Sequence, residues 1–340
     1  MRRRSILFGG MAIGFTLAEL GHGAGAQSYA LEGTEGLVAQ RIEMEAATYK
    51  GRKAVRLTKD SDEDGLALVK GADFQDGTIE VDLALKIPPL PPGARMPGFV
   101  GIAFRARADA SHYEVFYLRP GNSRATDQAM RNHSLQYCSD PDFGWLKLRR
   151  EWPSIYEAYA DLELETWTKV KIEVAGRLAT LYLNGSTKPS LIVDGLKGQD
   201  LHGAVALWGY GGEEAYFSNL RITPAATPQP IKNGGDAAGT WAVKGTTDVG
   251  PVSGSLKLTR DGNKLTGTWS GALGAEQPVS GTWRDGYVEI SWTGNWPKER
   301  PGTPGNANVT IVGWMDGDTA KGRMKVEGRA DGPWSANRAQ

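Results

Sequence analysis

The side chains best suited to acid–base chemistry gather in one stretch of the sequence, residues 112–152. Carboxyl and imidazole groups are the commonest proton donors and acceptors in catalysis. The catalytic candidates of this stretch are His112, Glu114, Asp127, His133 and Asp142. A hydrolytic pair must face a substrate from two sides, and no spacing among these residues shows such a pair. The sequence therefore supplies groups for catalysis without identifying a pair.

The same stretch is rich in arginine and aromatic side chains. Planar guanidinium groups hydrogen-bond hydroxyl or carboxylate oxygens, and aromatic faces cover the apolar C–H side of a sugar ring. The candidate ligand-binding residues are Tyr117, Arg119, Arg124, Arg131, His133, Trp145 and Arg149. In the alternative interpretation, the arginines only hold a long loop through ion pairs with Asp127, Asp142 and Glu151. Both interpretations remain open from the sequence.

Motifs for metals and other chemistries are incomplete. Asp60, Asp62 and Asp64 have the spacing that lets carboxylates converge on Ca²⁺, but Gly71 stands where the usual calcium loop has its last glutamate. An acidic surface turn is therefore favoured over a calcium site, and no cofactor is expected. The sequence also contains no His-Glu-x-x-His, Cys-x-x-Cys or Gly-x-Ser-x-Gly motif.

Short strands must position these residues. Between residues 27 and 223, apolar residues alternate with polar ones, as at Ile79, Val81, Leu83 and Leu85, and turn residues separate the runs. No segment has a long apolar stripe with helical period. We therefore expect an all-β fold for residues 27–223, an antiparallel jelly-roll sandwich.

The composition changes after this region. Residues 224–234 contain three prolines and end at the first glycine of the Gly234-Gly235 pair, a composition typical of a linker. Residues 235–340 repeat a Gly-Thr-Trp unit and place Asp-Gly pairs between alternating strands. This pattern predicts a second domain, a small up-and-down antiparallel β-barrel.

The first 26 residues have the features of a signal peptide. Arg2, Arg3 and Arg4 precede a modest apolar run, and Ala24-Gly25-Ala26 has the small-x-small form of a cleavage site. Arg3 and Arg4 also fit a twin-arginine signal, so the Sec and twin-arginine routes both remain possible. We expect a mature chain that is exported to the periplasm or secreted.

The overall charge, the hydropathy and the lone cysteine limit which binding partners and covalent links are expected. The chain has 39 basic and 39 acidic residues, so its net charge does not favour nucleic acid or anionic lipid. No run in the mature chain is long and apolar enough for a stable membrane anchor. Cys138 has no second cysteine with which to form an internal disulfide, and we expect it to be a buried thiol.

Several segments of the first domain resemble a known family. Phe74–Asp82, Gly101–Arg105, Tyr113–Pro120, Trp167–Ile172, Leu181–Gly185 and Phe217–Ile222 together resemble concanavalin A-like, laminin-G-like jelly rolls. The resemblance is greatest to exported bacterial members related to the 3-keto-disaccharide hydrolase group. The second domain is similar to small β-barrels appended to exported hydrolases. This resemblance implies a jelly roll that binds or acts on sugars, but one fold hosts many functions.

The resemblance does not extend to a complete catalytic motif. Jelly-roll glucanases carry Glu-x-Asp-x-x-Glu on one strand, whereas this chain has Glu80 and Asp82 followed by Leu85. We therefore expect Glu80 and Asp82 to form the solvated face of a strand. An exported carbohydrate-binding protein, with its glycan on the 112–152 face, is favoured. The alternative is an enzyme, a glycoside hydrolase or lyase acting on sugars that include oxidised ones.

Overall fold

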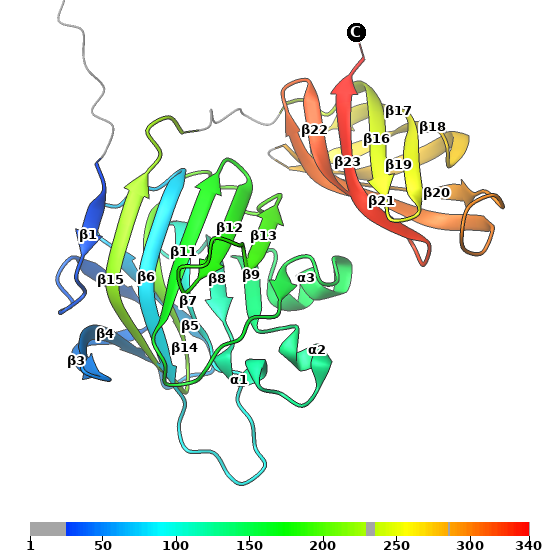
Figure 1. Ribbon diagram of the computed structural model, residues 1–340. Helices are drawn as coiled ribbons and strands as arrows, with labels where there is room; N and C mark the ends of the chain where they lie inside the picture. Colours follow the sequence, from blue (N-terminus) through cyan, green and yellow to red (C-terminus); the bar gives the residue numbers. More distant parts are fainter. Residues whose placement is uncertain (1–24, 229–234, 285, 340) are drawn as a thin grey trace, which may run out of the picture.

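The protein consists of two stacked β-sheets followed by a closed β-barrel (Figure 1). The computed structural model describes residues 25–228, 235–284 and 286–339. The predicted all-β class, a jelly-roll sandwich followed by an up-and-down barrel, is confirmed. Residues 1–24 of the predicted signal peptide and residues 229–234 of the predicted linker lie outside the described residues.

The first sheet has eight strands. Their spatial order is β13-β12-β11-β6-β15-β4-β3, with β1 paired to β15. The bounds are β1 Gln27–Tyr29, β3 Glu43–Tyr49, β4 Arg52–Thr58, β6 Gly77–Lys86, β11 Thr168–Ala175, β12 Leu178–Leu183, β13 Leu191–Asp194 and β15 Glu214–Pro224.

The second sheet has seven strands in the order β10-β9-β8-β7-β14-β5-β2. The bounds are β2 Leu37–Gln40, β5 Asp64–Val69, β7 Val100–Ala106, β8 Tyr113–Leu118, β9 Leu135–Asp140, β10 Glu157–Ala158 and β14 Ala204–Tyr210. Three short helices accompany it, α1 Pro120–Ser123, α2 Gln128–Arg131 and α3 Trp145–Glu151.

Alternation along the seven-stranded sheet separates a core face from an outer face. Phe104 of β7 and Phe116 of β8 belong to the hydrophobic cluster between the sheets, with ring centroids 6.2 Å apart. Successive side chains of a strand point to opposite faces. Tyr113 and Tyr117 therefore lie on the outer face of β8, and this face carries the site described below.

Residues 112–152 differ from the single long insertion that their polar composition suggested. They form β8, two helical turns, β9 and α3, so most of the stretch belongs to the sheet and its immediate cover. Strand β9 was missed because its sequence, Leu-Gln-Tyr-Cys-Ser-Asp, is mixed in polarity. All of its residues except Asp140 are nevertheless buried.

The predicted solvated face at Glu80 and Asp82 is wrong for the aspartate. Asp82 is 9% exposed, and its Oδ2 accepts hydrogen bonds from Arg52 Nη1 and Asn219 Nδ2, both at 2.8 Å. Neighbouring strands β4 and β15 bring these donors over β6, which alternation alone does not reveal. Glu80 is half-buried.

The barrel closes through eight consecutive antiparallel strands. The bounds are β16 Gly239–Thr247, β17 Gly250–Asp261, β18 Lys264–Gly271, β19 Gly274–Arg284, β20 Tyr287–Trp296, β21 Gly305–Asp316, β22 Thr319–Val326 and β23 Ala330–Arg338. Trp241 and Trp269, from two Gly-Thr-Trp units, are fully buried inside it, and Trp283 of the third is partly buried.

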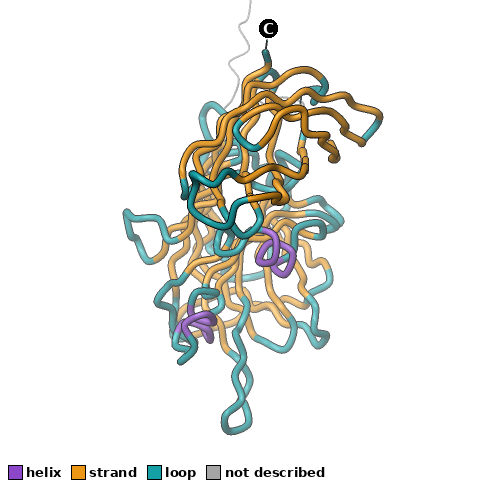
Figure 2. Tube along the Cα trace, turned by 90° about the vertical axis from the view of Figure 1, so that its right-hand side faces the viewer, coloured by secondary structure: helices purple, strands orange, loops and turns teal. Residues whose placement is uncertain are grey.

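The barrel packs against the sandwich through buried side chains; Figure 2 views the two from the barrel side. Its Tyr287, Val312 and Trp314 are buried in the same hydrophobic cluster as the sandwich core. Trp314 Nε1 donates a hydrogen bond to the Leu196 carbonyl of the sandwich at 2.8 Å. In the described part of the chain, no helix has the length and apolar character needed to cross a membrane.

Candidate functional site

A groove of about 500 Å³ lies over the outer face of the seven-stranded sheet. This volume falls in the range of small-molecule sites, which is roughly 300–1,000 Å³. Its aromatic lining consists of Phe99, Tyr113, Tyr117, Trp145, Trp208 and Tyr210. Its charged lining consists of Arg41, Glu63, Asp64 and Asp140. The groove thus combines flat apolar faces with hydrogen-bonding groups.

The floor of the groove is a stacked pair of rings. Tyr117 of β8 and Trp208 of β14 lie with ring centroids 4.9 Å apart and planes 20° from parallel. Gly101 of β7 stands opposite both residues in the sheet register. A Cβ on Gly101 would lie 2.7 Å from Tyr117 Cβ, so glycine leaves the room that the rings occupy. Phe99 and Tyr210 extend this aromatic surface, with centroids 4.9 Å apart.

Two carboxyl groups face the groove beside these rings. Asp64, at the start of β5, accepts hydrogen bonds from Trp208 Nε1 at 3.0 Å and from the Tyr113 hydroxyl. Burial, together with the negative charge of Asp64, raises the pKa of Asp140 to about 7. The groove therefore holds one carboxyl group with two hydrogen-bond donors and a second whose pKa is raised toward neutral pH.

Arg119 supports the floor from below and is 4% exposed. Its Nη2 donates to the Tyr117 hydroxyl at 2.9 Å, and its Nη1 donates to the His133 carbonyl at 3.1 Å and to Gln136 Oε1 at 3.2 Å. The guanidinium also lies 4.9 Å from the Tyr117 ring centroid. Because Arg119 donates to the Tyr117 hydroxyl and is not among the lining residues, it orients Tyr117 instead of projecting into the groove.

His133 and Arg149 meet at Glu157 of β10, near the α3 end of the groove. His133 Nδ1 lies 2.7 Å from Glu157 Oε2, and Arg149 donates to the same carboxylate from Nε at 3.1 Å and from Nη2 at 2.8 Å. Burial lowers the pKa of His133, against the opposing effect of Glu157. Arg149 also lies 4.8 Å from the ring centroid of Trp145, which is 44% exposed at the groove rim.

The remaining predicted residues on the helical turns lie outside the lining of this groove. Arg124 pairs with Asp161 and Glu163, each at 2.9 Å. Arg131 lies over the Tyr159 ring at 5.3 Å. Asp127 caps α2 by accepting a hydrogen bond from the Ala129 amide at 2.7 Å.

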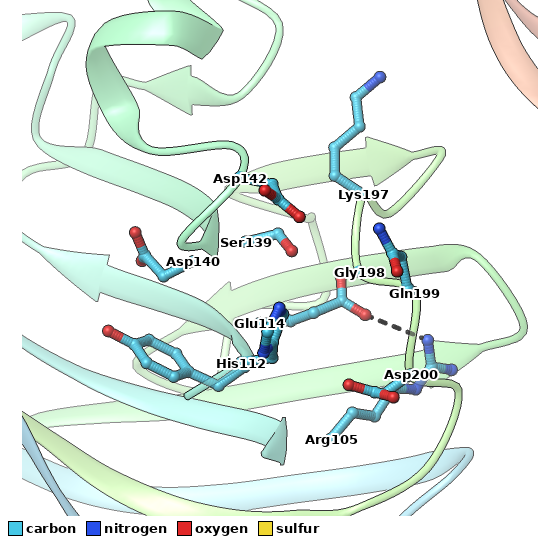
Figure 3. Close-up of a pocket in the computed structure, with 11 residues that line it drawn as sticks. Arg105, His112, Glu114, Ser139, Asp140, Asp142, Lys197, Gly198, Gln199 and Asp200 are labelled. Atoms are coloured by element: carbon cyan, nitrogen blue, oxygen red, sulfur yellow. Dashed lines mark hydrogen bonds and ion pairs between the residues drawn. The ribbon is translucent and has the colours of Figure 1, made fainter. Parts of the chain in front are cut away.

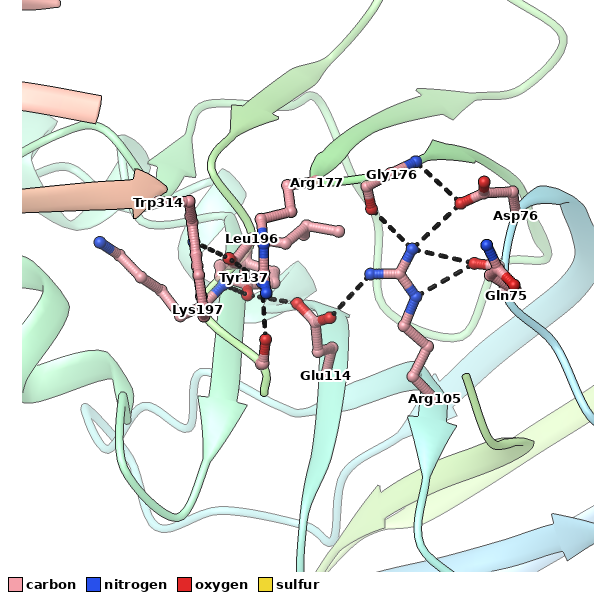
Figure 4. A network of polar contacts seen from close by, with 11 residues as sticks. Gln75, Asp76, Arg105, Glu114, Tyr137, Gly176, Arg177, Leu196, Lys197 and Trp314 are labelled. Atoms are coloured by element: carbon pink, nitrogen blue, oxygen red, sulfur yellow. Dashed lines mark hydrogen bonds and ion pairs between the residues drawn. The ribbon is translucent and has the colours of Figure 1, made fainter. Parts of the chain in front are cut away.

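Glu114 belongs to a buried network on the core face (Figure 4). Its carboxylate accepts from the Tyr137 hydroxyl at 2.6 Å and from Arg105 Nη1 at 3.3 Å. Arg105 also donates to Asp76 Oδ1 at 3.1 Å and to the Gly176 carbonyl at 2.6 Å. At 1% exposure, Glu114 is paired structurally and is not open to a ligand.

His112 and Asp142 line a second, much smaller pocket (Figure 3). Its volume is about 10 Å³, which is room for about one water molecule. His112 Nδ1 lies 2.9 Å from Arg107 Nη1, and Asp142 Oδ2 lies 3.5 Å from Arg284 Nη2 of the barrel. This pocket is too small to hold a sugar.

A further hollow of about 410 Å³ lies on the eight-stranded sheet. Its lining includes Glu80, Lys169, Lys171 and Tyr182. Lys171 pairs with Glu173 at 2.8 Å and lies 4.3 Å from the Tyr182 ring centroid. This hollow is lined by one aromatic ring, whereas six line the groove, so the hollow offers a poorer stacking surface for a sugar.

The three aspartates with calcium-like spacing do not converge. Asp60 and Asp62 are exposed, whereas Asp64 turns into the groove toward Tyr113 and Trp208. Among residues 25–228, 235–284 and 286–339, no three His, Cys, Asp or Glu side chains are grouped to hold a metal ion. Cys138 is free and buried in the groove floor, and burial raises the pKa of its thiol.

The sequence reasoning brought Tyr117 and Trp145 to this groove but missed several of its residues. Trp208 and Tyr210 are two positions apart on β14, so they share a face of the sheet. Asp140 is likewise two positions from Cys138 on β9. Strand period was thus the available signal, but it does not say which of the two faces carries a groove.

Comparisons with known proteins identify no family for this chain. No family profile and no curated protein matches it. Among solved structures, it is similar to a carbohydrate-binding module, CBM66, from Bacillus subtilis, with 15% identity, coverage of 54% of this chain and 96% of that chain, and a TM-score of 0.37. A Bacillus subtilis protein of unknown function with a galectin-like fold has 10% identity, coverage of 61% and 99%, and a TM-score of 0.42. The Ca²⁺-bound exoplasmic/lumenal domain of VIP36 has 12% identity, coverage of 56% and 86%, and a TM-score of 0.40.

Proposed function

We propose that this protein binds carbohydrate and that the glycan lies in the groove over Tyr117 and Trp208. The stacked pair of rings beside two carboxyl groups is the observation that carries the proposal. A sugar ring has apolar C–H faces and a rim of hydroxyls, so it fits a groove in which Trp145 is 44% exposed and Phe99 and Tyr210 are partly exposed beside this buried floor. Asp64 and Asp140 are within the groove to accept hydrogen bonds from hydroxyl groups.

The contacts of the arginines indicate that their guanidinium groups do not bind the sugar. Arg119 and Arg149 donate hydrogen bonds to other residues of the protein, and Arg124 pairs with two carboxylates. Removing such partners is costly for Arg119, whose guanidinium is buried. The aromatic rings and carboxyls, with Trp145 at the rim, therefore supply the ligand contacts in this proposal.

We also propose that the mature chain is exported, beginning near Gln27, by the Sec or twin-arginine route. Residues 27–223 would be the sugar-binding domain, residues 224–234 the linker and residues 235–340 the appended barrel. Recovery of the processed chain from the periplasm or medium, measured by mass spectrometry, is the expected result. An intact N-terminus on cytoplasmic protein would contradict it.

A glycan array probed with the mature chain tests the binding function. The chain should retain a defined set of oligosaccharides, and Trp208→Ala should lose them. Trp283→Ala, a partly buried tryptophan of the barrel, is the matched control and should retain the same set. A folded chain that retains no glycan, or equal retention by Trp208→Ala, would contradict the proposal.

Glycoside hydrolysis is the second candidate, and the Asp64–Asp140 pair favours it. Asp140, protonated near neutral pH, would donate its proton to the glycosidic oxygen as the C–O bond breaks. Asp64 would accept a proton from the water that attacks the anomeric carbon, so the products are two free sugars. The resemblance to the 3-keto-disaccharide hydrolase group extends this candidate to oxidised sugars.

Reducing-end release from the glycans that bind tests this candidate. Asp140→Asn should abolish release while binding persists, because an amide keeps the shape but has no carboxylic proton to give. Binding without any release by the unaltered chain would leave a lectin-like protein and exclude the hydrolase.

A further inference from the structure

The charged residues of the groove are mostly acidic. Glu63, Asp64 and Asp140 supply three carboxyls, and Arg41 supplies the one guanidinium of the described lining. Arg41 already donates from Nη1 and Nη2 to the Ala110 carbonyl, at 3.2 and 3.1 Å. This balance disfavours an anionic sugar and favours a neutral or cationic one.

Asp140 is the group in the groove that lacks a partner. Its carboxylate accepts no hydrogen bond from any described residue, in contrast to Asp64 with its two donors. Burial and the Asp64 charge hold the pKa of Asp140 at about 7. A cation placed beside Asp140 would offset both effects and stabilise the ionised carboxylate.

Aromatic rings surround the same space. Tyr117, Trp208, Phe99 and Tyr210 form a continuous surface, and Trp145 closes the rim. Ring faces attract ammonium groups, most strongly where water is excluded. A box of rings with carboxylates at one side is therefore suited to an amine on a sugar.

We propose that the glycan recognised in this groove is an amino sugar whose free ammonium group lies between Asp64 and Asp140. This inference rests on the proposed carbohydrate-binding function and specifies its ligand class. The sugar ring lies over Tyr117 and Trp208, and the ammonium compensates the negative charge that Asp140 gains when it ionises. Other charges near this position are Glu63 and Arg41 on the lining, Arg119 beneath Tyr117, and Glu213, whose Oε2 accepts from the Phe99 amide.

Calorimetry with three matched tetrasaccharides tests the inference. The probes are the β-1,4 tetramers of glucosamine, N-acetylglucosamine and glucose, titrated into the mature full-length chain at pH 6. The glucosamine tetramer should bind at least about ten-fold more tightly than the other two, a difference expected for one good charge contact. Titration in two buffers with different ionisation enthalpies should also reveal net proton release, as Asp140 ionises on binding.

Asp140→Asn is the informative variant, because it keeps the shape and removes the charge. It should lose the proton release, and its affinity for the glucosamine tetramer should no longer exceed its affinity for the glucose tetramer. Glu165→Gln, which alters an exposed carboxyl paired with Lys50 outside the groove lining, is the control and should keep both the preference and the proton release.

The outcomes separate this inference from the proposed function. Equal binding of the three tetramers, or tighter binding of the glucose or N-acetylglucosamine tetramer, would overturn the amino-sugar assignment and leave glycan binding intact. Binding of none of the three would also overturn it, and the glycan array would still decide the broader function. Binding of tetramethylammonium without any tetramer would show that the groove takes a cation without a sugar, and it would likewise overturn the amino-sugar assignment.

Discussion

Asp140 illustrates how a single residue acquires its properties from strand position. Its place on β9 puts it on the outer face, where burial and the nearby Asp64 disfavour its charge. Asp64 has nearly the same intrinsic acidity but receives hydrogen bonds from Trp208 and Tyr113. Two aspartates in one groove therefore differ in their hydrogen-bond partners, and the pKa of Asp140 is raised to about 7.

The raised pKa of Asp140 predicts a specific dependence of stability on pH. Between about pH 4 and pH 7 the folded state binds more protons than the unfolded state, so stability falls as pH rises through this window. Asp140→Asn removes the cost of ionisation and should raise the free energy of unfolding at pH 8 by up to about 4 kcal/mol. At pH 4 the effect should be near zero. Thermal melts of both chains at the two pH values measure this difference.

Asp127→Asn provides the comparison for that experiment, because Asp127 is an exposed helix cap. Its change in melting temperature should be small and nearly the same at both pH values. A pH-independent effect of Asp140→Asn would show that Asp140 does not titrate near neutral pH.

At the scale of elements, β7 determines the floor of the groove through one glycine. Gly101 lies between Tyr117 on β8 and Trp208 on β14 in the register. A Cβ at this position would lie 2.4 Å from the Phe116 carbonyl oxygen and 2.7 Å from Tyr117 Cβ. Backbone atoms cannot move aside cheaply inside a sheet.

Gly101→Ala should therefore separate the stacked rings and destabilise the sandwich by about 1–3 kcal/mol. Glycan binding should also weaken, even in the fraction of molecules that remains folded. Chemical denaturation and binding titration report the two effects. Gly144→Ala is the control, because its Cβ would meet only Asp140 Oδ1, at 3.8 Å; similar behaviour of the two variants would contradict the role of Gly101.

Strand alternation explains why much of the fold was predictable from the sequence. Runs such as Ile79–Leu85 repeat with the period of a strand, and the Gly-Thr-Trp units and Asp-Gly turns mark the hairpins of the barrel. The site was less accessible because it depends on partners far apart in the chain. Trp208 and Tyr117 are 91 positions apart and meet only because β7 lies between their strands.

The roles of the arginines were also hard to predict, because they too depend on contacts between distant segments. Their composition alone could not distinguish a sugar-binding patch from ties within the protein. Contacts such as Arg149 with Glu157, or Arg119 with Gln136, depend on which strand edge each side chain meets. Asp140 was similarly hidden, because nothing in its local sequence reveals that donors are missing around it.

At the scale of the whole molecule, the barrel is docked through buried aromatic side chains. Trp314 packs in the sandwich core cluster, donates to the Leu196 carbonyl and stacks beneath the Arg177 guanidinium, 2.9 Å from its ring centroid. Lys197 enters an aromatic box at the same junction and donates to the Tyr287 hydroxyl at 2.7 Å.

Truncation of Trp314 should therefore weaken the junction. Trp314→Ala should lower the free energy of unfolding by about 3–5 kcal/mol, because a large buried ring and a hydrogen bond are lost. Trp283→Ala, which removes a partly buried barrel ring over Arg260, should cost less. Calorimetric melting that shows equal losses would contradict a special role for the junction.

The junction also predicts the behaviour of a separated sandwich. Residues 27–228 expressed alone should fold but melt at a lower temperature than the full chain, because the surface under Tyr287, Val312 and Trp314 becomes exposed. Differential scanning calorimetry of the fragment and the full chain makes the comparison. An unchanged melting temperature would mean that the barrel adds no stability to the sandwich.

The most direct test of the central claim is a crystal structure of the complex with the oligosaccharide that binds best on the array. The groove account predicts a sugar ring stacked over Tyr117 and Trp208, with a polar group of the sugar within hydrogen-bond distance of Asp64 or Asp140. A sugar bound to the barrel, or in the hollow beside Lys169 and Tyr182 on the eight-stranded sheet, would contradict it.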